Sequence, residues 1–453
     1  MTSNKYKEGV LVTFLILLLS GSLHAQGLQP SPDLLLLDCG YGAAALGMAG
    51  AFVPVATDLS AVYWNPAGTA QTNGMQFFMD YSVSSDSDED FASEESLDSF
   101  QSAQRFSLSG NQFNSFALSY TFQVGKNRFT PIGAWHRMHY SSPDRELKAP
   151  ASTVDFITPQ QFFQSEGTFT ESRDGGEEEW TFGLAAMISG NILFGGTINF
   201  LKGNPDLNMS GTFRDSLIDT TGTITSDISL EQTTNEDLSG TYVKLGMLFL
   251  PQSPIRLGGT LRFPYTRSST LTLKRTGTVT TDGISTPLQQ DARAETSVNV
   301  PMEWSVGAGI LQKGTVISAT VTYSDWSTVL RTVTDSSNPL LIPNSELLYP
   351  VLRPNARQTS LLQYRIGTEY TSGKEGTGLI LRAGYLWDGQ PYGNGKREYL
   401  TGFSFGAGVA ARSFRADVAY ATEGGDVRLT RDSTADTHLS LRRFIFSVSL
   451  LSQ

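Results

Sequence analysis

Few residues of this sequence could carry chemistry in a defined geometry. His136 and His139 lie three positions apart, and His438 lies far along the chain. Successive side chains of a strand point to opposite faces, so two histidines three apart in a strand cannot share a metal ion. No serine and carboxylate stand where they could complete a catalytic triad with these histidines. The sequence therefore predicts no metal site, no cofactor and no enzyme.

An acidic run resembles the start of a calcium-binding loop. Residues 86–90 read Asp-Ser-Asp-Glu-Asp, but the glycine and the distal glutamate of such a loop are absent at the required spacing. We therefore expect a solvated external loop here rather than an ion site.

Charged residues inside alternating segments are a more informative set. If these segments are strands, the charges fall on the face that carries small and polar residues. They are Lys244, Arg256, Arg262, Arg365, Glu369, Arg382, Arg415, Asp417 and Arg443. Two interpretations are open: the cations bind an amphipathic anion such as a fatty-acid carboxylate, or the charges form an interior salt-bridge ladder. The cations considered for ligand binding are Lys244, Arg256, Arg262, Arg365 and Arg382.

The segments that hold these charges alternate apolar residues with polar or small ones. In residues 317–324, Ile, Ala, Val and Tyr share one face, while Ser and Thr share the other. Alternation over about ten positions is typical of membrane-spanning strands, which turn one face to lipid and the other to the lumen. We therefore predict an all-β chain that crosses a membrane.

Tight turns and long polar segments alternate along the chain. The turns lie at 125–127, 189–190, 251–254, 313–314, 372–376 and 411–412. The polar segments lie at 84–113, 141–177, 203–237, 265–302, 327–358 and 422–437. Short turns on one side and long loops on the other are typical of outer-membrane barrels. With a first strand near 75–83 and a last near 438–451, residues 74–453 predict a barrel of 14 antiparallel strands.

The N-terminus decides the compartment. Lys5 and Lys7 precede an apolar run at 10–19, so residues 1–25 are predicted to be a secretory signal peptide, cleaved after Ala25. No later stretch approaches the roughly 20 apolar residues of a transmembrane helix. A single cysteine, Cys39, cannot form a disulfide within the chain. The net charge of −11 disfavours a nucleic-acid partner and suits a surface-exposed protein with acidic loops. We therefore place the predicted barrel in the cell outer membrane.

Residues 26–73 precede the first strand and do not alternate. They contain a Gly- and Ala-rich apolar stretch that is too apolar for a free tail. A barrel of 14 strands is wide enough to leak unless something fills it. We therefore expect this segment to occupy the lumen as a hatch.

The same segment carries a recognisable pattern. Residues 45–53 read ALGMAGAFV, residues 58–61 read DLSA, and residues 63–68 read YWNPAG. This pattern resembles the hatch of the FadL/TodX family, and the Asn-Pro-Ala of that hatch matches Asn65, Pro66 and Ala67, with Gly68 following. The resemblance implies an outer-membrane channel for long-chain fatty acids or other hydrophobic compounds. It implies a hydrophobic or lipid ligand captured at external loops, and we expect a monomer surrounded by outer-membrane lipids.

A second function stays open. The hatch pattern also occurs in barrels related to PorV and PorQ, which serve protein secretion rather than uptake. The chain departs from the usual barrel pattern at its end, because Leu451-Ser452-Gln453 lacks a terminal aromatic residue.

The third predicted strand, 128–140, is where the alternation fails. In the family that the chain resembles, a kink in the third strand beside the hatch opens the wall, and ligand leaves sideways into the bilayer. Here Pro131 cannot donate a ladder hydrogen bond and Gly133 offers no side-chain packing, so we expect poor pairing. This predicts a lateral exit at Pro131 and Gly133. The alternative is that Pro131 is simply tolerated near a strand end.

Overall fold

The computed structural model describes most of the chain after residue 39. The described residues are 40–91, 105–139, 142–155, 162–219, 222–251, 254–281, 283–328, 331–336, 360–373, 377–390, 398–427 and 436–451. The predicted signal peptide (1–25), the first part of the predicted hatch (26–39) and Cys39 lie outside them. Within the described part of the chain, no helix is long and apolar enough to span a membrane.

The described strands close a barrel of 14 antiparallel strands. Its first strand, β1 (Met75–Phe91), pairs with the last, β21 (Asp436–Leu451), and so closes the ring. The strands between them are β2 (Arg105–Tyr120) with its continuation β3 (Phe122–Val124), β4 (Asn127–His139), β7 (Gly176–Ser189), β8 (Ile192–Gly203), β10 (Gly222–Phe249), β11 (Ile255–Arg262), β14 (Glu303–Gln312), β15 (Thr315–Asp325), β17 (Ser360–Thr371), β18 (Gly378–Gln390), β19 (Glu398–Ala410) and β20 (Phe414–Val427). The predicted 14-stranded barrel is confirmed.

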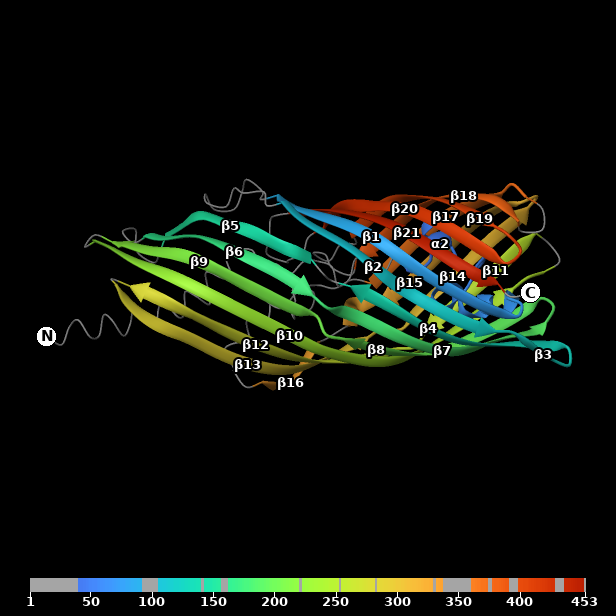
Figure 1. The fold of residues 1–453 in the computed structure, drawn as a ribbon, viewed down its shortest axis with the longest axis horizontal. Helices are drawn as coiled ribbons and strands as arrows, with labels where there is room; N and C mark the ends of the chain where they lie inside the picture. Colours follow the sequence, from blue (N-terminus) through green and yellow to red (C-terminus); the bar gives the residue numbers. More distant parts are fainter. Residues whose placement is uncertain are drawn as a thin grey trace.

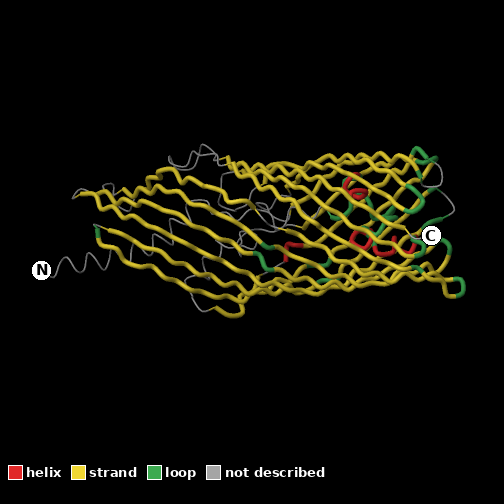
Figure 2. The backbone as a smooth tube through the Cα atoms, in the orientation of Figure 1, coloured by secondary structure: helices red, strands yellow, loops and turns green. Residues whose placement is uncertain are grey.

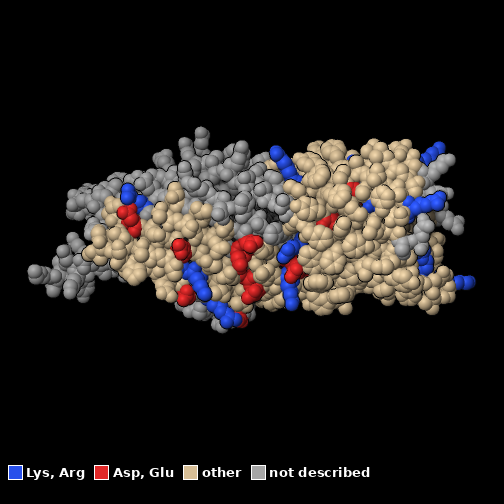
Figure 3. Space-filling model, in the orientation of Figure 1, with Lys and Arg blue, Asp and Glu red and all other residues tan. Residues whose placement is uncertain are grey.

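Alternation separates the two faces of the wall as the sequence predicts. On β15, Ile317 is 51% exposed, whereas the next residue, Ser318, is 1% exposed. On the face shown in Figure 3, most of the barrel surface carries no charged side chain, and charged residues gather near its two ends. A closed barrel with an apolar outer surface belongs in the outer membrane.

The tight turns join neighbouring strands at the barrel end that holds the C-terminus (Figure 1). The opposite end corrects the sequence prediction, because segments expected to be loops form a sheet. This outer sheet consists of β5 (Ser142–Asp155), β6 (Phe162–Asp174), β9 (Asp206–Asp219), the first part of β10, β12 (Tyr265–Thr281), β13 (Ile284–Val300) and β16 (Arg331–Ser336). Residues 86–90, also expected in a loop, continue β1.

Glycine and proline mark the line where the outer sheet leaves the barrel. Gly175 separates β6 from β7, and Pro205, Pro264 and Pro301 stand where β8 passes to β9, β11 to β12 and β13 to β14. Gly175 has a φ of 84°, which suits glycine, and proline donates no ladder hydrogen bond. Of the described strands in the outer sheet, β10 alone crosses this line unbroken, pairing with β9 and β12 outside and with β8 and β11 in the barrel.

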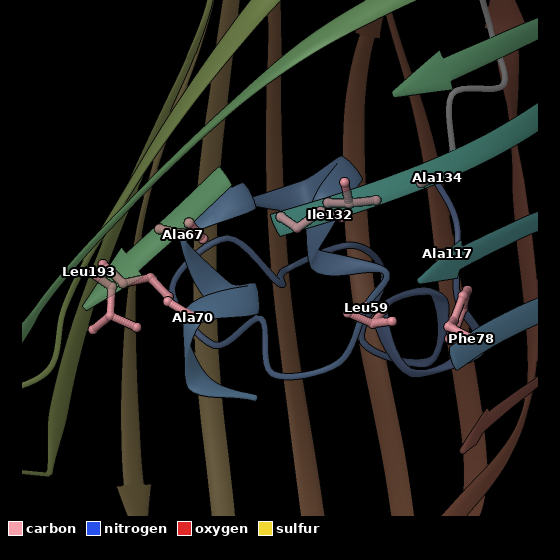
Figure 4. Close-up of a cluster of buried hydrophobic side chains, with 11 residues drawn as sticks. Leu59, Ala67, Ala70, Phe78, Ala117, Ile132, Ala134 and Leu193 are labelled. Atoms are coloured by element: carbon pink, nitrogen blue, oxygen red, sulfur yellow. The ribbon is translucent and has the colours of Figure 1, made fainter. Parts of the chain in front are cut away.

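Of the predicted hatch (26–73), residues 40–72, here called the hatch segment, lie inside the barrel (Figure 2). It contains α2 (Ala43–Gly47), α3 (Ala61–Trp64) and the 3-10 helix η2 (Pro66–Gln71), and a further 3-10 helix, η3 (Trp326–Thr328), follows β15. Its apolar side chains pack against the wall, where Leu59, Ala67 and Ala70 share a buried cluster with residues of β1, β2, β4 and β8 (Figure 4). These wall residues include Phe78, Ala117, Ile132, Ala134 and Leu193.

Candidate functional site

The hatch segment presses against the wall where the strands carry glycine. At each of these glycines, a Cβ atom would come within 3.1 Å of a hatch atom. They are Gly195, Gly246, Gly258, Gly307, Gly309, Gly367, Gly384 and Gly406, from β8, β10, β11, β14, β17, β18 and β19. At Gly258, for example, the added Cβ would lie 2.6 Å from the carbonyl oxygen of Val53. The wall therefore accepts the hatch backbone only because side chains are missing there.

Asn65 fastens three parts of the molecule together. It is fully buried, and its Oδ1 accepts a hydrogen bond of 3.2 Å from the backbone of Ala67, which caps η2. Its Nδ2 donates to the carbonyl oxygens of Val53 (2.9 Å) and of Met247 on β10 (3.1 Å). Pro66 occupies the first position of η2, where its missing N–H costs nothing. The Asn-Pro pair thus forms a capped local turn at the start of η2.

The other end of the hatch segment is held by strands that close the barrel. The backbone N–H of Gly42 donates to Asp80 on β1, and that of Ala43 donates to the hydroxyl of Ser447 on β21, both at 2.9 Å. Between the two ends, Asp58 accepts hydrogen bonds from the backbone and hydroxyl of Ser60. Burial raises the pKa of Asp58, which Arg415 partly opposes.

Most of the luminal cations predicted from the sequence are held by acids. Arg365 is 7% exposed, forms an ion pair of 2.7 Å with Asp388, and lies over the ring of Trp64 in the hatch at 5.6 Å. Arg382 has a fully buried side chain and bridges Glu369 (2.7 Å) and Asp417 (2.8 Å). Arg415 extends this group by pairing with the same two acids. Its contacts are 2.7 Å to Asp417 and 3.7 Å to Glu369.

The remaining cations have different surroundings. Arg262 pairs with Glu303 at 3.3 Å and lies 6.0 Å from the rings of Tyr242 and Tyr265. Lys244 donates to the carbonyl oxygen of Tyr63 in the hatch and lies over the ring of that tyrosine. Arg256 lies near the turn end of β11, and the structure does not place it with the buried ion pairs. These contacts favour the salt-bridge ladder over a carboxylate site.

The ladder between β2 and β4 is short and interrupted, and we call this stretch of wall the β2–β4 seam. It pairs only Ser115–Ser119 with His136–Ile132, and pairing resumes at Phe122 with Phe129 after a gap opposite Pro131. On the other side of β4, pairing with β7 runs through Pro131 without a break. The expectation of poor pairing was wrong for Gly133, which pairs with Leu118 and Phe182.

Aromatic residues cover both sides of the seam. Toward the lipid, Trp135 stacks with Phe113 and Phe116 at ring distances of 5.9 and 5.7 Å. Toward the lumen, the ring of His136 stacks on Tyr41 of the hatch at 4.3 Å. Sequence reasoning missed Tyr41, Phe113 and Trp135, because their meeting depends on the register between strands. His136 is 2% exposed, and the structure shows no metal-binding group of three His, Cys, Asp or Glu in its described residues.

The barrel fold is found in solved structures. The Pseudomonas putida toluene transporter TodX matches with a TM-score of 0.59 at 16% identity, covering 92% of this chain and 99% of that chain. A Pseudomonas aeruginosa FadL homologue matches with a TM-score of 0.56 at 13% identity, covering 92% and 98%. The Ralstonia pickettii toluene transporter TbuX matches with a TM-score of 0.54 at 13% identity, covering 92% and 99%. No protein-family model and no curated protein matches the sequence.

These likenesses establish the fold. The chain has the outer-membrane barrel architecture of the FadL homologue and of TodX, as the hatch pattern led us to expect.

Proposed function

We propose that this protein is an outer-membrane channel for the passive uptake of hydrophobic small molecules. The fold it shares with TodX, TbuX and a FadL homologue supports this function, since TodX and TbuX are toluene transporters. Its outer-sheet end provides the surface for capture of a hydrophobic compound, such as a fatty acid or an aromatic hydrocarbon. Residues 65–68 act within this channel as the fastening of the hatch.

The contact between hatch and wall argues against a straight path for a compound through the barrel lumen. The hatch segment meets glycines on seven strands at distances that leave no room for a Cβ atom. Buried apolar clusters also join the hatch segment to β1, β2, β4, β7, β20 and β21. A compound that enters from outside must therefore leave before it reaches the hatch, or displace it.

The observation that carries the proposal is the β2–β4 seam. Five paired positions join these strands, with an interruption opposite Pro131 on one side and the end of the ladder at His136 on the other. Unpaired backbone is costly against lipid, so a short ladder in a membrane wall calls for a use. We propose that a hydrophobic compound leaves sideways through this seam into the bilayer.

A reversible cross-link tests this exit. Leu118 and Gly133 face each other across the seam, so cysteines at both positions, in a chain with Cys39→Ser, would lock it when oxidised. We expect oxidation to lower the uptake of radiolabelled toluene about tenfold or more, and a reductant to restore it. The matched control places cysteines at Phe182 and Ile198, which face each other on β7 and β8 and are similarly exposed to lipid.

Three outcomes separate the possibilities. Loss of uptake in the seam pair alone supports lateral exit. Equal uptake in the oxidised seam pair and the control would show that the exit lies elsewhere. A barrel that serves protein secretion or interaction would take up no toluene in any variant, and the uptake proposal itself would then fail.

A further inference from the structure

A row of buried polar side chains faces the lumen at the end of the seam that lies farther from the tight turn between β3 and β4. Asp80, Ser115 and His136 lie directly opposite one another on β1, β2 and β4, and Asn114 is the extra residue of a bulge beside Ser115. All four are at most 2% exposed. We call Asp80, Asn114, Ser115 and His136 the polar row.

Each member of the polar row has a polar atom that makes no hydrogen bond of ordinary geometry with the described residues, although the side chains of Ser115 and Asn114 lie close enough to Asp80 to stabilise its carboxylate. These atoms are Asp80 Oδ1, Asn114 Nδ2, Ser115 Oγ and His136 Nδ1. A buried polar atom left in this state costs about 1–3 kcal/mol, so most such atoms in proteins are paired. Four of them on adjacent positions of three strands indicate a place built to bind something polar.

The surroundings fix the row against the hatch. Asp80 uses its other oxygen, Oδ2, to accept the backbone N–H of Gly42 at 2.9 Å. His136 stacks on the ring of Tyr41 at 4.3 Å. Both contacts hold their side chains in place, so the unpartnered atoms are positioned rather than free to seek other partners.

The set of atoms suits an uncharged group better than an anion. The Asn114 amide donates, the Asp80 oxygen accepts, and the serine hydroxyl can do both. A hydroxyl, which also donates and accepts, can satisfy such a set, whereas a carboxylate would face the oxygen of Asp80. Arg443 interacts electrostatically with Asp80, so its positive charge is offset by an acid of the row itself.

Other luminal cations already bind acidic side chains or the hatch backbone. The guanidinium groups of Arg262, Arg365 and Arg382 are paired with acids, and Lys244 donates to the hatch backbone. A carboxylate ligand would have to break one of these contacts to pair with Arg262, Arg365, Arg382 or Lys244. The site therefore selects against the anion that the cation-rich face suggested from the sequence.

Apolar surface lies on either side of the row. On the side of the row nearer the tight turn, Phe78, Ala117 and Ala134 belong to the buried cluster between hatch and wall. On the opposite, lipid-facing side of the same strands, Trp135 stacks with Phe113 and Phe116. The ladder between β2 and β4 ends at the row itself, with Ser115 opposite His136.

We propose that the polar row binds the hydroxyl group of an uncharged hydrophobic compound, an alcohol or a phenol, at the entrance to the β2–β4 seam. This inference rests on the proposed uptake function and narrows its substrate class. The hydroxyl pairs with the row while the apolar body lies against the aromatic and aliphatic side chains around it.

The test compares three probes of one shape: 1-naphthol, naphthalene and 1-naphthoate. Binding is measured on the purified full-length barrel in lipid nanodiscs, with empty nanodiscs subtracted. We expect 1-naphthol to bind about tenfold more tightly than either naphthalene or the anion, the effect of one or two buried hydrogen bonds. In the double variant Ser115→Ala with His136→Phe, which keeps a ring against Tyr41, this preference should fall to about twofold or less.

A matched control uses Ser404→Ala, because Ser404 on β19 is also fully buried with an unpartnered hydroxyl. It should keep the wild-type preference for 1-naphthol. If the double variant does not fold, the single change Asn114→Leu, which keeps the side-chain shape, takes its place and should reduce the same preference.

The outcomes distinguish this inference from the proposed function. Equal binding of naphthol and naphthalene, tighter binding of the anion, or an unchanged preference in the variants would overturn the hydroxyl site and leave a hydrophobic channel. Failure to bind any of the three probes would remove the proposed function, and the hydroxyl site with it.

Discussion

The wall formed by β17–β21 and the wall formed by β1–β4 are built in different ways. The ladder between β18 and β19 runs through 13 paired positions, whereas that between β2 and β4 has five before it is interrupted. The first wall holds buried ion pairs, including that of Arg365 with Asp388. The second holds the polar row, whose atoms lack partners. The ion pairs of the first wall are complete in the folded protein, whereas the polar row leaves polar atoms that a ligand can bind.

This difference separates stability from transport. Charges that are paired and buried resist change, since removing one partner leaves the other uncompensated. Polar atoms that lack partners are a cost to the folded state, and such costs concentrate at functional sites. Substitutions in the two regions should therefore affect different measurements.

The largest effect is expected at Arg365. Replacing it by methionine removes the buried ion pair with Asp388 and the contact with Trp64, so we expect the barrel to lose about 3–5 kcal/mol of stability. Urea unfolding of the barrel in lipid measures this loss. Arg412→Met, at an exposed turn, is the control. Equal stability of the two variants would mean that the ion pair does not hold the hatch side of this wall.

The seam should respond in transport rather than in stability. Pro131→Val with Gly133→Thr restores a regular strand, and nothing lies within 4 Å of a Cβ added at Gly133. We expect toluene uptake to fall roughly fivefold while the unfolding midpoint changes by less than the Arg365 variant does. Heat-modifiable migration on gels measures the folded amount. Unchanged uptake in a folded barrel would support the alternative that Pro131 is merely tolerated.

The smallest effect is expected at the wall glycines. Gly258 faces the hatch, with Val53 O only 2.6 Å from an added Cβ, whereas the nearest atom at the neighbouring Gly259 is 3.7 Å away. Gly258→Val should loosen the hatch and give small ion currents in planar bilayers, and Gly259→Val should stay closed. Equal conductance of the two variants would show that this contact does not seal the lumen.

Much of the barrel could be predicted because each strand carries its own pattern. Ile317 and Ser318 differ in hydropathy, and this difference assigns their faces without knowledge of any other strand. The outer sheet escaped prediction for the same reason. Its strands are rich in polar residues, as in β12 with its many threonines, so their pattern looks like that of a polar loop.

The candidate site was harder to predict than the fold. Asn65 and Pro66 form a local turn, and a local turn can be derived from two residues. The polar row instead requires the register of three strands and the bulge at Asn114, which no short segment encodes. Gly133 shows the opposite error, because a glycine that weakens packing still pairs through its backbone on both sides.

The unbroken strand β10 makes the outside of the cell and the hatch mechanically continuous. Its 28 residues, at about 3.3 Å each, reach roughly 90 Å, several times the thickness of the apolar band of a barrel of about 25 Å. The first part of β10 is a central strand of the outer sheet. Near its other end, the carbonyl oxygen of Met247 accepts a hydrogen bond from the side chain of Asn65. A pull or twist on the outer sheet is thus delivered to the fastening of the hatch along a single stiff rod. The neighbouring strands, broken by proline or glycine at the membrane surface, would bend and absorb it.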